Sequence, residues 1–251
     1  MEKVDIITVT PENIDNYPPR CFLNPKNEGY QIKKEWLNQR FSEGLTIKLL
    51  YLDNKCIGFI EYVPGEHAWR PVNARDYLFI HCIWISPNKH KEKGNGSLLV
   101  KDCIKDAEQR GKLGVAVITS EGPFMAGKDL FLKNGFTTVS QVKLSYELLV
   151  KQLKKGPLPC LNKTDKDLSI YQGLHIIYAN QCPWVARSIR ELSDIAEEKG
   201  LVSHFTELHS AEEAQQAPNV YGVFTLIYNG AILADHYIST TRFKNILKKI
   251  K

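Results

Sequence analysis

The sequence lacks any long hydrophobic run. Its 251 residues contain no stretch of about 18 apolar residues, the length that a membrane-spanning helix needs. Residues 1–5 are charged and lack the apolar core of a secretory signal peptide. We therefore expect a cytoplasmic protein with no membrane partner.

Paired cysteine motifs are also missing. Six cysteines occur, but none form a Cys-x-x-Cys pair and none lie near histidines at the spacing of a zinc finger. The pattern predicts no metal site and is typical of a reducing compartment.

Charge of one sign is not concentrated anywhere in the sequence. The formal net charge is +5, and the lysines are spread along both halves. A nucleic-acid-binding protein usually shows a denser basic stripe or an aromatic RNA-binding motif, so we expect no nucleic-acid partner. A mild positive balance does suit an anionic cofactor.

The pattern that is present indicates a mixed α/β fold in the first half. Segments rich in β-branched residues alternate with segments of helical spacing. The most aromatic and β-branched of them, residues 77–85, predicts a central strand. The other predicted strands are 4–9, 46–52, 56–63, 115–119, 136–139 and 142–149, and the predicted helices are 30–41, 98–110 and 128–133.

A change in composition divides the chain. Residues 151–167 hold two prolines and five lysines with little periodicity, which predicts a linker or an extended strap. The second half is compact. Its predicted strands are 174–178, 202–208, 223–228 and 232–237, and its predicted helices are 183–199 and 240–250. We therefore predict a domain over 1–150, a linker over 151–170 and a second domain over 171–251.

The most informative segment is a strand, a glycine loop and a helix in succession. Ile83, Trp84 and Ile85 end the central strand, and Gly94 and Gly96 precede the helix. The first amides of a helix are unpaired and lie at the positive end of its dipole, which is where a pyrophosphate binds. The spacing matches neither a P-loop nor a dinucleotide-binding loop. An ordinary glycine turn before a helix is the alternative.

This segment resembles the cofactor loop of the Gcn5-related N-acetyltransferase (GNAT) family, whose pattern is [QR]-x-x-G-x-[GA]. The matching residues are Lys91-Glu92-Lys93-Gly94-Asn95-Gly96, with Lys91 in place of the usual Gln or Arg. Two flanking segments, Ile57-Gly58-Phe59-Ile60 and Phe131-Leu132-Lys133-Asn134-Gly135-Phe136, are similar to the family's second hairpin strand and its "Y-E-K-x-G-F" segment. The resemblance covers residues 1–150.

The resemblance implies a fold, a donor and an acceptor. Acetyl-CoA would lie between two splayed central strands, and the main chain of Ile83, Trp84 and Ile85 would pair with its pantetheine arm. A backbone amide near Ile83 would polarise the thioester carbonyl. An amine of a small molecule or a peptide would attack the thioester directly. The pyrophosphate would bind amides of Lys91, Glu92, Lys93, Gly94, Asn95, Gly96 and Ser97.

The resemblance is weaker for the catalytic residues. Many relatives have a tyrosine that protonates the departing thiolate, and Phe131 occupies that position here. Another group then donates the proton, or the thiolate leaves unassisted, or activity is lost. His81 shares the strand parity of Ile83 and is a candidate general base, although a bulge would break that parity. A hydrogen-bonded core histidine is the alternative.

Four further residues are candidates for the site. Glu61 and Glu121 lie at or near strand ends and are alternative general bases, or else solvated rim residues. The loop 64–71 contains Trp69 and Arg70 and is expected either to shape the substrate pocket or to pack its aromatic beneath the loop.

The second half resembles a thioredoxin-like fold, through Cys182-Pro183-Trp184-Val185 and Tyr221-Gly222-Val223-Phe224. Val185 replaces the resolving cysteine, and Phe224 replaces the cis-proline of that fold. Cys182 would lie at a helix N-terminus, where a thiol pKa is lowered. A structural module or a substrate-selecting lid are the alternatives. The domain order resembles the YoaP-like acetyltransferases of bacteria.

We therefore predict a mixed-sheet α/β protein with a GNAT fold followed by a smaller thioredoxin-like α/β domain. The predicted activity is transfer of an acetyl group from acetyl-CoA to an amine. Two other functions remain open: a thiol or redox protein centred on Cys182, and a non-catalytic acyl-CoA sensor suggested by Phe131. A homodimer is also left open.

Overall fold

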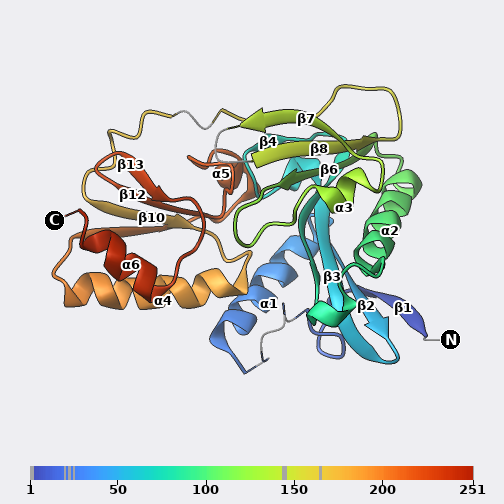
Figure 1. Ribbon diagram of the computed structural model, residues 1–251, viewed down its shortest axis with the longest axis horizontal. Coiled ribbons are helices and arrows are strands. Elements are labelled where there is room, and N and C mark those ends of the chain that lie inside the picture. The colour runs from blue at the N-terminus through green and yellow to red at the C-terminus, as the bar shows by residue number, and fades with distance from the viewer. Residues whose placement is uncertain are drawn as a thin grey trace. The chain divides into compact units, whose positions relative to one another are not determined.

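Figure 1 shows the computed structural model of the chain, which describes residues 3–19, 21, 24, 26–142, 146–163 and 166–250. The chain forms two compact units. The first unit comprises Met1–Phe22, Asn38–Ala68 and Val72–Leu161, and the second unit comprises Leu23–Leu37, Trp69–Pro71 and Asn162–Lys251.

The first unit is built on a seven-stranded mixed sheet with the order β1-β2-β3-β5-β6-β8-β7. All neighbouring strands are antiparallel except β5 and β6, which are parallel. The mixed sheet predicted from the sequence is therefore confirmed. Its strands are β1 (Val4–Val9), β2 (Thr46–Leu52), β3 (Lys55–Pro64), β5 (Tyr77–Ile85), β6 (Gly114–Thr119), β7 (Thr137–Val142) and β8 (Tyr146–Gln152).

The two central strands separate partway along their length. β5 and β6 pair only as far as Ile80 and Val117. Beyond that point β5 pairs with β3 as far as Ile85, while β6 pairs only with β8. The edge of β5 that faces β6 is therefore left without a β6 partner over its last five residues, 81–85.

A β-bulge lies where the central strands begin to separate. Ile80 is opposite Tyr62 and Cys82 is opposite Glu61, so His81 is the extra residue on β5. The bulge shifts the alternation of side chains along the strand. The sequence placed the side chains of His81 and Ile83 on the same side of the strand by assuming a regular pleat. The bulge at His81 interrupts that pleat.

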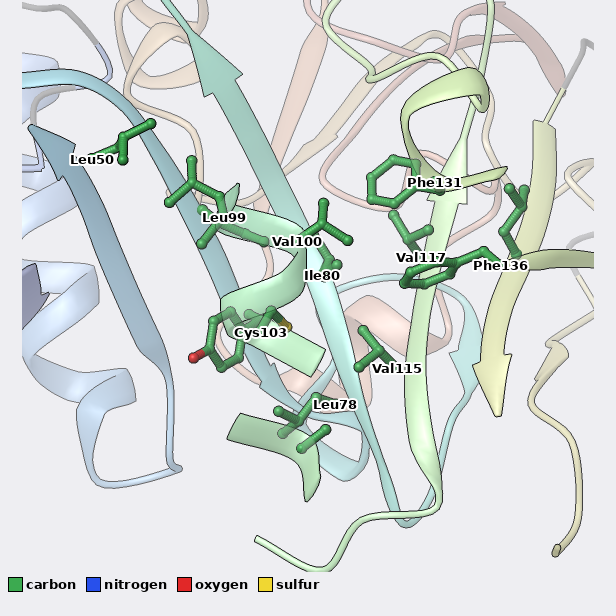
Figure 2. Packing of buried hydrophobic residues seen from close by; sticks show 14 of the residues in the cluster. Leu50, Leu78, Ile80, Leu99, Val100, Cys103, Val115, Val117, Phe131 and Phe136 are labelled. Carbon is green, nitrogen blue, oxygen red and sulfur yellow. The ribbon is translucent and has the colours of Figure 1, made fainter. Parts of the chain in front are cut away.

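Helix α2 (Asn95–Gln109) packs on this sheet and fills the core of the first unit. Figure 2 shows Leu99, Val100 and Cys103 of α2 facing Ile80 and Val117 of the central strands. These five side chains are at most 3% exposed. The apolar residues recur at helical spacing because one face of an amphipathic helix must be buried. This packing fixes the start of α2 beside the end of β5.

The second unit has a four-stranded sheet with the order β11-β10-β12-β13. β10 and β11 are parallel, and the other pairs are antiparallel. Helices α4 and α6 pack together in this unit (Figure 1). The strands are β10 (Leu174–Tyr178), β11 (Ser203–Glu207), β12 (Phe224–Tyr228) and β13 (Ala231–Ala234), and the helices are α4 (Pro183–Glu198), α5 (Ala211–Gln215) and α6 (Thr240–Leu247).

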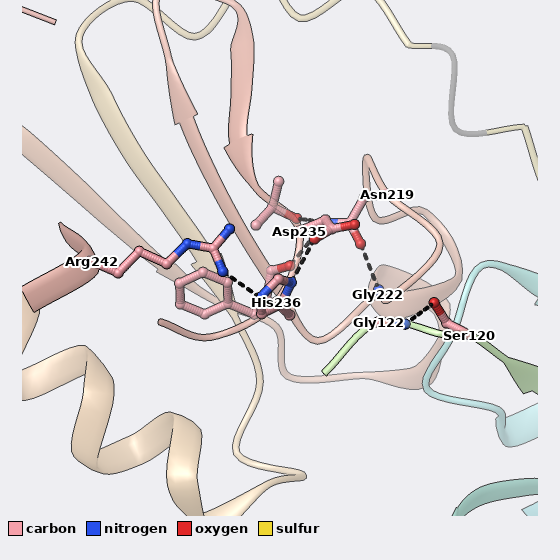
Figure 3. A network of polar contacts seen from close by, with 9 residues as sticks. Ser120, Gly122, Asn219, Gly222, Asp235, His236 and Arg242 are labelled. Carbon is pink, nitrogen blue, oxygen red and sulfur yellow. Dashed lines mark hydrogen bonds and ion pairs between the residues drawn. The ribbon is translucent and has the colours of Figure 1, made fainter. Parts of the chain in front are cut away.

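A polar chain ties the end of this sheet to α6. Arg242 Nη1 donates to His236 Nε2 at 2.9 Å, and His236 Nδ1 donates to Asp235 Oδ1 at 2.7 Å (Figure 3). Arginine can only donate, so this network assigns the proton of the neutral ring to Nδ1. Asn219 makes a second network, donating to Phe224 O at 2.9 Å and accepting from Gly222 N at 3.0 Å.

The compact units do not follow the predicted boundary at residue 150. Two segments of the first half, Leu23–Leu37 and Trp69–Pro71, belong to the second unit. The division falls inside helix α1 (Glu28–Phe41), between Leu37 and Asn38. The predicted linker is also partly structured, because β9 (Cys160–Leu161) pairs with β4 (Val72–Asn73) in the first unit.

Gly29 lets the start of α1 lie close to Pro183, the first residue of α4. A Cβ atom on Gly29 would lie 2.3 Å from the carbonyl oxygen of Pro183. We expect Gly29→Ala to destabilise the protein by about 1–3 kcal/mol, because overpacking against backbone forces a shift. Thermal unfolding measures this loss. Gly127→Ala, where a Cβ meets nothing within 4 Å, is the control. Equal unfolding temperatures for the two variants would contradict the close approach.

Most predicted elements are present with ends moved by a few residues. β1, β5 and β10 match their predicted ranges, while β13 ends at Ala234 rather than at Tyr237. The sequence did not indicate β4, β9 or α5. Of the predicted strand 142–149, residues 143–145 lie outside the described residues. In the described part of the chain, every helix is too short or too polar to cross a membrane.

Candidate functional site

The glycine loop presents unpaired amides at the start of α2. Glu92 and Gly94 have φ values of 60° and 84°, and α2 begins at Asn95. Within the described residues, the backbone N–H groups of residues 92–97 donate to no other protein group, and Leu98 makes the first helical bond, to Gly94 O. Left-handed residues in such a turn let successive amides point to one side, where an anion binds.

Side chains hold this loop in place. Asn95 Nδ2 donates to His90 O at 2.9 Å, and Asn134 Nδ2 donates to Ser97 Oγ at 2.9 Å and to Leu130 O at 2.7 Å. A Cβ on Gly96 would lie 3.2 Å from Leu130, so the loop packs closely against helix α3 (Asp129–Leu132). Two of the motifs that resemble the GNAT family therefore meet.

Cationic and aromatic side chains surround the loop. Lys91 Nζ lies 5.6 Å from the centre of the Trp84 ring, and Trp84 is 45% exposed. Lys93 and Glu92 are exposed on the same loop. The positive charge of the lysines adds to that of the helix terminus.

A hollow of about 40 Å³ lies where the central strands separate. The residues that line it come from β5, β6, the segment before α3 and α3 itself. They are Ile80, His81, Cys82, Ile83, Trp84, Val117, Ile118, Phe124, Met125, Ala126 and Phe131. The sequence did not indicate Cys82, Phe124 or Met125. One signal could have indicated the last two: Phe124 and Met125 are an apolar pair that directly follows a strand and a Gly-Pro turn.

His81 and Glu61 form a buried pair at this hollow. His81 Nδ1 lies 3.3 Å from Glu61 Oε1, and the two side chains are 0% and 2% exposed. The His81 ring also packs edge-on against Phe79, with 5.7 Å between ring centres. His81 lines the hollow even though the bulge breaks its parity with Ile83. The sequence could not show this pairing, which places a buried carboxylate 3.3 Å from Nδ1 of the imidazole.

Glu121 and Phe131 differ in their positions. Glu121 is exposed beyond the end of β6 and is not among the residues that line the hollow. Phe131 is buried, lines the hollow and packs against Phe136 at 5.4 Å between ring centres. No tyrosine is among the lining residues that the structure describes.

Trp69 and Arg70 belong to the second unit and do not line the hollow. Trp69 is 1% exposed and packs edge-on against Trp36 of α1, with 5.2 Å between ring centres. Of the two expectations for this loop, the buried aromatic is confirmed, although helix α1 rather than the loop itself covers the ring.

The prediction of a low thiol pKa for Cys182 is wrong. Burial raises the pKa of this thiol. The amides of Trp184 and Val185 at the start of α4, together with Lys33 and Arg70, act in the opposite direction but do not outweigh burial. This removes the main physical argument for a redox protein centred on Cys182.

Cys182 should therefore react slowly with iodoacetamide at neutral pH. The thiolate is the reactive form, and a raised pKa lowers its fraction. We expect alkylation of Cys182 to lag behind that of Cys160, which is exposed, by about 10-fold near pH 7. Peptide mass mapping after timed labelling measures both sites in one sample. Faster labelling of Cys182 than of Cys160 would contradict the effect of burial.

The comparisons with known proteins identify the family of this chain. Residues 12–136 match the model of the acetyltransferase (GNAT) family, and residues 204–245 match the YoaP-like model. The chain belongs to the GNAT family of N-acetyltransferases. It is 30% identical over 250 residues to YoaP of Bacillus subtilis (strain 168), an uncharacterized N-acetyltransferase, covering 97% of this chain and 98% of the relative.

Solved structures are similar to the first part of the chain. The PaiA N-acetyltransferase of Thermoplasma acidophilum, in complex with coenzyme A, is 16% identical with a TM-score of 0.44, over 60% of this chain and 99% of that one. The ribosomal-protein-S18-alanine N-acetyltransferase of Escherichia coli is 13% identical with a TM-score of 0.43, over 62% of this chain and 97% of that one. The thioredoxin-like fold of the second unit stays a prediction.

Proposed function

We propose that the first unit transfers an acetyl group from acetyl-CoA to an amine of a small molecule or a peptide. The observation that supports this best is the row of unpaired amides over residues 92–97, next to the gap between β5 and β6. The PaiA relative in complex with coenzyme A agrees with a coenzyme A donor. Among the described residues, the amides of 92–97 and the nearby lysines fit its pyrophosphate, and the edge of β5 beyond Ile80 fits its pantetheine arm.

The residues that would hold the donor follow from these positions. The amides of Glu92, Lys93, Gly94, Asn95, Gly96 and Ser97 are the proposed partners of the pyrophosphate. The Lys91 amide, which the sequence also predicted as a partner, already donates to Asn88 O at 2.9 Å. The main chain of Ile83, Trp84 and Ile85 is free of β6 and is the proposed partner of the pantetheine arm. Bound acetyl-CoA would supply an activated acetyl thioester, and the acceptor nitrogen would form the new C–N bond as the C–S bond breaks.

His81 is the proposed general base of the transfer. It lines the hollow, and Glu61 lies 3.3 Å from its Nδ1. A carboxylate at that position orients the ring and stabilises the imidazolium that forms when the acceptor proton is taken up. Glu121 is the weaker candidate, because its exposed side chain lies outside the hollow's lining.

A second candidate function is an acyl-CoA sensor, which Phe131 favours because it cannot protonate the departing thiolate. Calorimetry with acetyl-CoA, followed by measurement of free thiol release with a panel of amines, tests both functions. The proposal expects binding and steady thiol release that depends on the amine. Binding without thiol release would leave the sensor, and no binding would exclude both.

A further inference from the structure

Three chain segments bring a buried cluster of polar side chains together inside the second unit. We call Lys33, Trp36, Arg70, Gln181 and Cys182 the Arg70 cluster. Lys33 and Trp36 lie on α1, Arg70 lies in the segment Trp69–Pro71, and Gln181 and Cys182 precede α4. Neither catalysis nor donor binding in the first unit uses these residues.

Arg70 is a buried cation with a neutral partner. It is 5% exposed, and its Nη1 donates to Trp69 O and to Gln181 Oε1, both at 2.8 Å. Its guanidinium lies 5.2 Å from the centre of the Tyr221 ring. In the described part of the chain no carboxylate pairs with Arg70, and its Nε and Nη2 donate to no protein group. A buried charge is normally paired, so this arrangement is costly unless an anion joins it.

Lys33 and Trp36 add a second charge and an unused donor. Lys33 is 1% exposed, and its Nζ lies 4.2 Å from the centre of the Trp36 ring. Trp36 is 6% exposed, and its buried Nε1–H has no acceptor among the described residues. The Trp36 ring packs against Trp69, the residue before Arg70. The indole N–H is therefore a further donor within the same cluster.

Cys182 does not neutralise these cations. Both Lys33 and Arg70 act electrostatically on its thiol, which places them near it. Burial keeps the thiol in its neutral form because it raises the thiol pKa. The start of α4 adds the partial positive charge of its amides. Arg70 therefore contributes a buried positive charge, and no carboxylate of the described residues accepts a hydrogen bond from its guanidinium.

We propose that the second unit binds a small oxyanion, a carboxylate or a phosphate group, at the guanidinium of Arg70 and beside Cys182. The guanidinium fork matches two oxygens of such a group, and exclusion of water strengthens the pair. The Trp36 N–H would complete the contacts. The first half of the chain would thus supply three of the five residues of a site in the second unit.

Protection of Cys182 from iodoacetamide tests this proposal in the full-length protein. Labelling is done at about pH 9, where more of the thiol is ionised. Inorganic phosphate and acetate are titrated separately against sodium chloride at equal ionic strength, and peptide mass mapping follows each thiol. We expect one or both anions to slow labelling of Cys182 by about 5-fold or more at saturation, as a bound ligand shields its site. Labelling of exposed Cys160 should not change. The anion that protects identifies the oxyanion class.

Variants separate this site from general effects of salt. Arg70→Gln should abolish protection, whereas Arg190→Gln, which removes an exposed cation on α4, should leave it unchanged. Trp36→Phe keeps an aromatic ring but removes the N–H together with the pyrrole part of the indole, so the affinity should fall about 3-fold or more. Circular dichroism confirms that each variant is folded. If Arg70→Gln does not fold, Arg70→Lys takes its place and should weaken binding about 10-fold, because lysine lacks the fork.

Calorimetry with the same two anions decides the outcome if Cys182 does not label at all. A heat of binding that the Arg70 variant removes and Arg190→Gln retains would support the site. The proposal is overturned if neither anion protects Cys182 or gives a heat of binding. It is equally overturned if the Arg70 variant and the wild-type protein respond alike.

Discussion

The Gly94→Glu variant should lose at least about 100-fold in affinity for acetyl-CoA, equivalent to about 2.7 kcal/mol. Gly94 has a φ of 84° and precedes the first residue of α2, where the amides are unpaired. A carboxylate there would repel the pyrophosphate and compete for the same N–H groups. Isothermal titration calorimetry measures the loss directly.

A matched control separates this loss from backbone strain. Gly111, just after the other end of α2, also has a positive φ, of 67°, and a Cβ there meets only the Lys154 amine, at 3.7 Å. Both Gly→Glu variants therefore pay the strain of a left-handed residue, about 1–2 kcal/mol. Only Gly94→Glu should weaken acetyl-CoA binding. Unchanged affinity in Gly94→Glu, with the fold retained, would remove the amide row from the proposed donor site.

The His81→Gln variant should lower kcat by about 100-fold or more, the usual contribution of a general base. His81 lines the hollow between the central strands, and glutamine of similar size cannot take up the proton at neutral pH. Binding of acetyl-CoA should be retained, because the amides of the glycine loop are untouched. Steady-state kinetics together with calorimetry measures the two quantities separately.

Glu61→Gln tests the positioning role of the carboxylate. We expect kcat to fall by about 10-fold with little change in donor affinity, because the ring of His81 loses the charge that orients it. The limb of the pH–rate profile that reports the base should vanish in His81→Gln and shift in Glu61→Gln. Glu121→Gln, which alters an exposed side chain, is the control and should leave kcat and the pH–rate profile unchanged. A larger loss in Glu121→Gln than in His81→Gln would reverse the assignment.

The local sequence pattern was sufficient to predict most helices and strands of the first unit. β5 was predictable because aromatic and β-branched residues run without interruption through residues 77–85, and the hairpin between β2 and β3 because Asp53 and Asn54 favour a turn. The glycine loop was predictable because Gly94 precedes a strongly amphipathic helix. Each of these signals depends only on residues close in the sequence.

The pairings at the sites could not be predicted in the same way. The sequence offered His81 and Glu61 as separate candidates, since nothing local places β3 opposite a bulge in β5. It assigned Trp69 and Arg70 to the loop 64–71 of the first predicted domain, whereas they belong with Cys182 and Gln181 in the second unit.

The amino-acid sequence by itself determined most of the strands and helices and the glycine loop, because propensity, periodicity and turn preference act over a few neighbouring residues. The tertiary structure alone decided which side chains face each other: Glu61 with His81, and Arg70 with Gln181. It also decided that the pKa of the Cys182 thiol is raised, since desolvation depends on how much of the chain packs around a thiol and not on the residues beside it.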